Sequence, residues 1–281
     1  MQSRPAGLHS PAAKVSFVTR AREPVFNIPA VILAILAGLA ALHVLRMNLP
    51  DGTGFYLLSE LAFVPARLTA LFDPSGVRVA IAAVAAQGPD GPDSGLLELM
   101  GDTSAKLWTM VTYSGLHANW THLGLNSLWL LAFGSPVARR FGAARFAGLF
   151  VAAAIGGALA HAIAHPYGLS PVIGASASVS GAMGAALRFA FQQGGPRSAP
   201  LPVARVFADP RTLPFLAVWF VVNIATGLAA VPLGLSDSNI AWEAHVGGLM
   251  AGLLLFPLFD PRGPLAPSGE AAHSPPPDGA A

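Results

Sequence analysis

Long stretches of this chain carry no charged side chain, and several are apolar enough to cross a lipid bilayer. Only 11% of the 281 residues are charged, whereas soluble domains usually carry about a quarter. A helix rises 1.5 Å per residue, so about 20 apolar residues cross a hydrocarbon core of roughly 30 Å. The pattern predicts an all-α, multi-pass integral membrane protein.

Six segments are predicted to be membrane spans. They are residues 28–49, 116–136, 146–165, 174–192, 213–232 and 239–259. Residues 1–27 are predicted to be a loosely ordered amino-terminal segment, residues 28–260 the six-helix membrane domain, and residues 261–281 a disordered tail. Residues 50–115 form a long first loop. The first span is interpreted as a retained helix, because a long polar leader precedes it and no small-residue cleavage site follows.

Basic side chains are concentrated on one side of this predicted bundle. The amino terminus, the connections after the second and fourth spans, and the start of the tail hold 12 of the 16 Lys and Arg residues. The positive-inside rule then predicts that both termini are cytoplasmic. The second, fourth and sixth spans therefore run in the same direction, and a bacterial inner membrane is the simplest setting.

The segment Gly174-Ala-Ser-Ala-Ser-Val-Ser-Gly181 places three hydroxyl groups in an apolar part of the chain. Its small residues either allow helices to pack closely or present Ser176 as a nucleophile. The helix-compatible residues 177–191 are too few to span alone. The backbone before Ser176 is therefore expected to enter the bilayer without helical structure, which requires surrounding protein or a water-filled cavity.

Three polar positions fall at a similar depth if this orientation holds. His122 and Asn126 share one face of the second span, Ser176 begins the fourth, and His245 lies early in the sixth. An imidazole within reach of a serine is the usual base for a nucleophile. Imidazole and amide N–H groups can stabilise an oxyanion. The alternative is that these residues make structural hydrogen bonds within the bundle.

Two glycines on the His245 face, Gly248 and Gly252, would let a neighbouring helix approach closely. This pattern is typical of ordinary helix packing, but it would also bring Ser176 close to His245. His117 is interpreted as structural. Ser178 is expected to face the other side of its helix and to serve packing.

These residues resemble the motifs of the rhomboid family of intramembrane serine proteases, over roughly residues 108–260. The matching segments are His117-Ala-Asn-Trp-Thr-His-Leu-Gly-Leu-Asn126, Gly174-Ala-Ser176 with Gly181 and Gly184 after it, and Ala244-His-Val-Gly-Gly248. The resemblance implies a six-helix bundle whose first loop is partly immersed in the membrane.

The resemblance also implies the roles of particular residues. Ser176 and His245 would form a catalytic dyad without an acidic member. His122, Asn126 and the backbone N–H of Ser176 would hold the oxyanion during cleavage of a peptide bond through an acyl-enzyme.

The partners that the resemblance implies are transmembrane protein substrates and the lipid bilayer. A substrate helix would enter beside the fifth span, around Trp219 and Phe220. No cofactor, metal ion or nucleic acid is expected.

One residue departs from the family pattern, because Ala177 stands where the family usually has glycine. Its methyl group leaves two functions open, a serine endopeptidase and a catalytically inactive rhomboid-like protein that binds membrane-protein clients. Ser180, followed by Gly181, is a second candidate nucleophile. That alignment would shift the downstream glycines by four positions, so Ser176 is preferred.

Two other functional classes are disfavoured. His161 and His165 are four residues apart, a spacing that suits metal or haem ligation. Apart from Glu243 near the membrane edge, no carboxylate or cysteine accompanies them, so hydrogen bonds to neighbouring helices or an interfacial position are expected. A transporter is disfavoured because no inverted repeat or charged midplane pair is present. If neutral His245 is the base, activity should rise through about pH 6–7.

Overall fold

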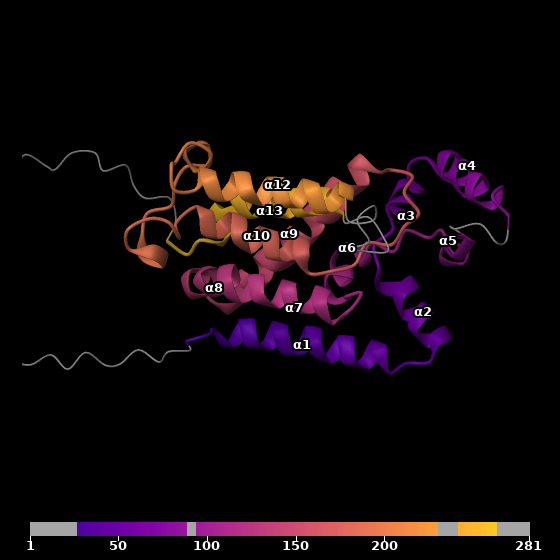
Figure 1. Ribbon diagram of the computed structural model, residues 1–281, viewed down its shortest axis with the longest axis horizontal. Helices are drawn as coiled ribbons and strands as arrows, with labels where there is room; N and C mark the ends of the chain where they lie inside the picture. The colour runs from indigo at the N-terminus through magenta and orange to yellow at the C-terminus, as the bar shows by residue number, and fades with distance from the viewer. Residues whose placement is uncertain (1–26, 89–93, 230–240, 263–281) are drawn as a thin grey trace, which may run out of the picture.

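The computed structural model describes residues 27–88, 94–229 and 241–262. Within them the chain is helical, apart from one isolated antiparallel bridge between Phe63 and Val172. The predicted amino-terminal segment and tail lie almost wholly outside the described residues. Helices α1, α7, α12 and α13 run roughly along the long axis of the molecule, and the short helices of the first loop gather at one end (Figure 1). The predicted all-α membrane bundle is confirmed.

Three helices in the described part of the chain are long and apolar enough to cross a bilayer alone. They are α1 (Ala30–Met47), α9 (Ala143–Ala164) and α13 (Trp242–Phe259). Helix α12 (Leu213–Ala229) is apolar but shorter. All four fall within or close to the segments that hydropathy indicates, which identifies the chain as an integral membrane protein.

The second predicted span is one nearly continuous helix with an irregular turn. It consists of α7 (Trp120–Trp129), a π-helical turn η2 (Leu130–Gly134) and α8 (Ser135–Phe141). The helix begins at Trp120, later than the predicted start of the span, and it continues through Pro136 to Phe141. Proline lacks a backbone N–H, and the wider π turn immediately before it accommodates the missing hydrogen bond.

The fourth predicted span contains a short buried helix, α10 (Ser176–Leu187). It packs against both α9 and α13, which also pack against each other. A Cβ atom added to Gly252 would overlap the carbonyl oxygen of Gly181, and one added to Gly248 would overlap that of Ala177. Helices α10 and α13 therefore meet at backbone contact, as the small residues on both faces permit.

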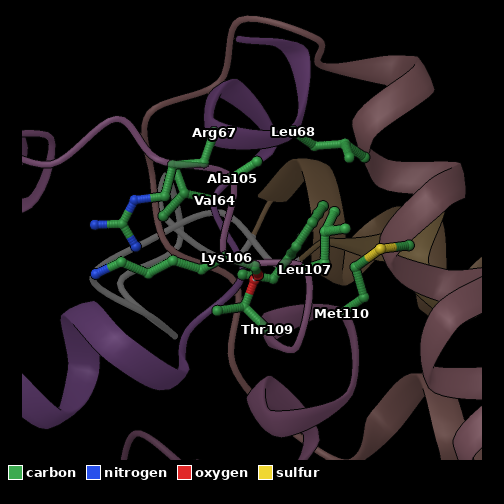
Figure 2. A pocket seen from close by; sticks show the side chains of 9 residues that line it. Val64, Arg67, Leu68, Ala105, Lys106, Leu107, Thr109 and Met110 are labelled. Carbon is green, nitrogen blue, oxygen red and sulfur yellow. The ribbon is translucent and has the colours of Figure 1, made fainter. Parts of the chain in front are cut away.

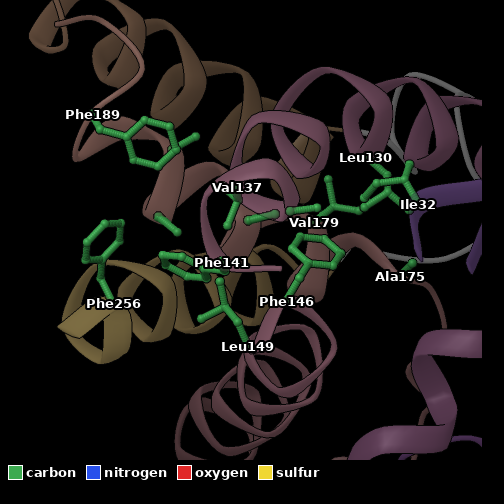
Figure 3. Packing of buried hydrophobic residues seen from close by; sticks show 14 of the residues in the cluster. Ile32, Leu130, Val137, Phe141, Phe146, Leu149, Ala175, Val179, Phe189 and Phe256 are labelled. Carbon is green, nitrogen blue, oxygen red and sulfur yellow. The ribbon is translucent and has the colours of Figure 1, made fainter. Parts of the chain in front are cut away.

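The main hydrophobic core joins α1, α8, α9, α10 and α13. Figure 3 shows that it extends from Phe189 and Phe256 at one end to Ala175 at the other. The rings of Phe141 and Phe256 pack edge to face, with centroids 5.1 Å apart. Because Ala175 directly precedes Ser176, this core fixes the position of the amino-terminal end of α10.

The first loop folds into a layer of short helices rather than an extended connection. They are α2 (Asp51–Leu61), α3 (Pro65–Thr69), α4 (Pro74–Ala85), α5 (Ser94–Leu99), α6 (Thr109–Thr112) and the 3₁₀ turn η1 (Tyr113–Gly115). That α4 is too short to span a bilayer agrees with the sequence prediction for this region.

Arg67 is the centre of this layer. Its guanidinium group, almost fully buried, donates to the carbonyl oxygens of Ser59, Leu99 and Asp102. Figure 2 shows the Arg67 and Lys106 side chains next to each other, with their charged ends on the same side. The hollow that they line measures about 10 Å³, room for about one water molecule, so it is not a substrate site.

The opposite end of the bundle is held by buried arginines. Arg140 of α8 forms an ion pair with Asp260, 2.7 Å from nitrogen to oxygen, just beyond α13. It also donates to the carbonyl oxygens of Pro196 and Ser198, near the 3₁₀ turn η3 (Gly195–Arg197) and before α11 (Val203–Val206). These bonds join the end of α8 to the residue after α13 and to the loop that follows α10.

Candidate active site

A cavity of about 150 Å³ lies between α7, η2, α10, α12 and α13. Five polar side chains line it, from Asn126, Ser176, Ser180, Asn223 and His245. The rest of its wall is apolar and consists of Trp129, Phe133, Val179, Met183, Trp219 and Val222. A cavity of this size and polarity has room for several water molecules. A hydroxyl group and an imidazole therefore share one cavity inside an apolar bundle.

Ser176 is placed by the backbone that precedes it. Residues 165–175 are non-helical, as predicted, and Gly174 has a φ of +124°, which favours glycine. The N–H of Gly174 donates to the carbonyl oxygen of Tyr113 at 2.9 Å, and that of Ala175 donates to Nε2 of His117 at 3.4 Å. His117 is thus buried and structural, as the sequence analysis proposed.

Ser176 is also the first residue of α10. The N–H of Val179 makes the first internal hydrogen bond of the helix, to the carbonyl oxygen of Ala175. The N–H of Ser176 therefore belongs to the first turn, whose donors have no partner within a helix. The positive end of the helix dipole lies at the same point. Both features favour an anion beside Ser176.

His245 lies in the first turn of α13, where its Nδ1 atom is 2.6 Å from Oδ1 of Asn223 on α12. An amide oxygen only accepts hydrogen bonds, so the bond assigns the proton to Nδ1 and leaves a lone pair on Nε2. Asn223 was not among the residues predicted from the sequence. Its amide is the only one in this apolar span and lies one helical turn from Trp219. Because polar groups inside membranes are costly, such an amide indicates a functional position.

Asn126 and His122 approach Ser176 from α7. Asn126 is buried in the cavity wall, and its side-chain amide donates to the backbone carbonyl of His122 at 3.0 Å. A Cβ atom added to Gly174 would lie 2.8 Å from Nε2 of His122 and 3.7 Å from Oγ of Ser176. The His122 ring and the Ser176 hydroxyl therefore both lie close to the position that a side chain at Gly174 would occupy.

The two aromatic residues predicted as a substrate gate lie on α12. Trp219 lines the cavity, and the ring of Phe220 packs against it edge to face, with centroids 5.0 Å apart. On the same helix Val218 and Val221 are exposed. One face of α12 thus borders the cavity while another faces outward, and the gate role itself stays a prediction.

The neighbours of Ser176 have different surroundings. Ser178 donates to the carbonyl oxygen of Phe150 on α9 at 2.8 Å, which agrees with its predicted packing role. Ser180 lies one turn beyond Ser176 and lines the same cavity. Ala177 is not part of the cavity wall, and its Cβ lies 2.5 Å from where a Cβ would stand on Gly157 of α9. The additional methyl group is therefore accommodated by a glycine outside the site.

His161 and His165 do bond to a neighbouring helix, through Glu243 of α13. Nδ1 of His161 lies 3.3 Å from one carboxylate oxygen, and Nε2 of His165 lies 2.9 Å from the other. The Glu243 carboxylate thus joins the two imidazoles.

Comparison with known proteins places this arrangement in a family. A family model described as the Rhomboid domain matches residues 104–261, more than half of the chain. The chain belongs to the rhomboid family. This match contains α7, α10, α12 and α13, so it includes every helix that lines the cavity.

Several curated proteins are similar to this rhomboid chain. "Rhomboid protease GluP" of Bacillus subtilis (strain 168) is 32% identical over 146 residues, which are 52% of this chain and 24% of that protein. "RHOMBOID-like protein 1" of Arabidopsis thaliana is 27% identical over 271 residues, 88% of this chain and 60% of the relative. The chain thus spans less than two thirds of the length of these rhomboid relatives.

Proposed function

We propose that this rhomboid chain is an intramembrane serine endopeptidase that cleaves transmembrane protein substrates. The observation that carries the proposal is the shared cavity, because Ser176 of α10 and His245 of α13 both line it. The two residues are far apart in the sequence, and the glycine contacts between α10 and α13 bring their helices together. The similarity to a bacterial protein named as a rhomboid protease supports the same activity.

His245 is the general base in this mechanism. Because Nδ1 donates to Asn223, the lone pair of Nε2 is available to accept the Ser176 proton. The Ser176 oxygen attacks the scissile carbonyl carbon, and a tetrahedral oxyanion forms. When the C–N bond breaks, the imidazolium returns its proton to the leaving amine, and an acyl-enzyme remains.

The oxyanion is stabilised by donors around the start of α10. The available groups are the Ser176 N–H, the Asn126 side-chain amide in the cavity wall, and the His122 ring, which lies beside Gly174 but is not part of the cavity lining. In the resting structure one of the two amide N–H groups of Asn126 donates to its own helix, and the second is left to donate to the oxyanion. Donors of this kind act strongly where bulk water is excluded.

Water completes the reaction by attacking the acyl-enzyme, with His245 again as the base. The cavity has room for that water, and α12 with Trp219 and Phe220 borders the route by which a substrate helix enters. We place the protein in a bacterial inner membrane with both termini in the cytoplasm, as the distribution of basic residues favours.

The second function, an inactive rhomboid-like protein that binds membrane clients, depended on the methyl group of Ala177. That methyl group contacts Gly157 rather than the cavity, so it gives no steric reason for inactivity. The protease is therefore the better-supported proposal.

Labelling with a fluorophosphonate probe, which reacts with activated serines, tests the proposal. We expect the wild type to be labelled and Ser176→Ala and His245→Ala to lose the label. Ser180→Ala is the matched control, since its hydroxyl lines the same cavity, and it should retain labelling. An unlabelled wild type would favour client binding, and loss of label only in Ser180→Ala would reassign the nucleophile. Cleavage of a generic transmembrane substrate in detergent is the companion assay.

A further inference from the structure

The geometry points to a binding site for one divalent transition-metal ion, such as Zn²⁺, between α9 and α13. Its ligands are His161 and His165, at the carboxyl end of α9, and Glu243 in the first turn of α13. These residues do not line the catalytic cavity. The inference is therefore independent of the proposed protease activity.

The three side chains present one donor atom each to a common point. The donor atoms, two imidazole nitrogens and one carboxylate oxygen, all lie within 4.8 Å of one another. A tetrahedral ion with bonds of 2.0–2.2 Å requires about 3.4 Å between donor atoms. His161 already lies 3.3 Å from one carboxylate oxygen of Glu243, and His165 lies 2.9 Å from the other. Small side-chain rotations suffice to complete the site.

The spacing of the histidines suits a single ion. His161 lies in the last turn of α9 and His165 is the residue that caps this helix, four positions later, a spacing that also occurs in helical zinc sites that supply two histidine ligands. A third ligand from a neighbouring helix leaves the fourth coordination position for water. Two nitrogens and one oxygen suit Zn²⁺, Co²⁺, Ni²⁺ or Cu²⁺ rather than Mg²⁺ or Ca²⁺, which prefer oxygen alone.

The site is reachable from solvent but largely enclosed. The His165 side chain is 50% exposed, whereas those of His161 and Glu243 are 14% and 16% exposed. An ion can therefore enter past His165 and bind against two nearly buried ligands. Once bound, it connects the end of α9 to the start of α13 more firmly than the present hydrogen bonds do.

Metal titration of the full-length protein tests this inference. The detergent-purified chain is stripped with a chelator and titrated with Zn²⁺, and binding is followed by calorimetry and thermal unfolding. We expect His165→Ala and Glu243→Gln each to bind one ion fewer per chain than the wild type. At 100 times the dissociation constant, Zn²⁺ should raise the wild-type Tm by on the order of 5–10 °C, and neither variant should show this rise.

Three further variants make the result specific. Glu98→Gln removes an exposed carboxylate on α5 and should bind like the wild type. Ser176→Ala should also bind normally, which separates the metal site from the proposed catalysis. Because the chain has no cysteine, His165→Cys introduces a single thiolate ligand and should give a thiolate-to-cobalt charge-transfer band with Co²⁺. Equal stoichiometry and equal thermal shifts in the wild type, His165→Ala and Glu243→Gln would overturn the inference.

Discussion

Nδ1 of His245 lies 2.6 Å from Oδ1 of Asn223, across the contact between α13 and α12. The bond fixes the tautomer of the imidazole and holds its ring in the cavity that Ser176 also lines. Asn223 thus connects the proposed base to the helix that borders the proposed substrate route. A movement of α12 would be transmitted to His245 through this bond.

Replacing Asn223 with Leu should lower kcat by about 10- to 100-fold, with a smaller effect on KM, because His245 loses its orienting acceptor. A general base typically accelerates a reaction by 10²–10⁴-fold, and a misoriented imidazole would lose part of that acceleration. Asn223→Asp retains an acceptor and should recover most of the activity. It should also move the pH–rate profile to higher pH, since a carboxylate stabilises the imidazolium.

The control for this pair is Thr226→Ala. Thr226 lies nearby on α12 but bonds only to carbonyl oxygens of its own helix, so activity should be unchanged. A pH–rate profile identical in the wild type and Asn223→Asp would remove Asn223 from the mechanism.

Replacing Asn126 with Leu should lower kcat by about 10²–10³-fold, the usual cost of losing one oxyanion donor. KM should change little, because the donor acts on charge that develops only in the transition state. Ser127→Ala is the matched control, since its hydroxyl bonds within α7. Steady-state cleavage kinetics measure both, and equal effects on kcat in the two variants would argue against an oxyanion role.

Ala177→Gly should leave cleavage within about threefold of the wild type, because the Ala177 methyl group faces Gly157 and not the cavity. It should cost about 0.5–1 kcal/mol in stability, as glycine usually does inside a helix. A large gain in cleavage or in probe labelling would show instead that the methyl group restricts the site.

Gly252→Ala should destabilise the protein by roughly 1–3 kcal/mol or more and abolish probe labelling. The new methyl group would overlap the carbonyl oxygen of Gly181, so α13 must move away from α10 and carry His245 with it. Gly38→Ala on α1 is the control, because it meets no atom within 4 Å and should retain both stability and labelling. Thermal unfolding and labelling of both variants provide the comparison.

Acid should weaken the first loop through Asp73. Its carboxylate accepts hydrogen bonds from the Ser75 hydroxyl, the Gly76 N–H and the Tyr167 hydroxyl, and these bonds lower its pKa to about 2. The pKa in the unfolded chain is higher, about 3.9. The contribution of the carboxylate is therefore complete above roughly pH 4 and lost as the pH falls toward 2.

Asp73→Asn tests this dependence. The Tm difference between the wild type and this variant should be constant from about pH 7 to pH 5 and should shrink steadily as the pH falls from 5 through 2. A difference that persists unchanged to pH 2 would mean that the charge of Asp73 contributes nothing.

Much of this fold can be predicted from the sequence, because hydropathy and helical periodicity are local properties. The apolar runs predict the spans, and the common direction of three of them predicts that Asn126, Ser176 and His245 lie at one depth. Their meeting in one cavity agrees with that prediction, while their catalytic roles stay predictions. The continuation of α8 through Pro136 was not predicted, because a π turn depends on the register of the whole helix.

The sequence by itself determined the class of protein, the order of its helices and the candidate residues. The tertiary structure decided which faces meet. It turned Asn223 toward His245, directed the methyl group of Ala177 toward Gly157, and brought Glu243 between His161 and His165. The physical reason is that the rotation of each helix and its distance from its neighbours depend on close packing between segments far apart in the chain. Here that packing runs through the glycines of α9, α10 and α13. No local sequence pattern specifies these rotations and distances.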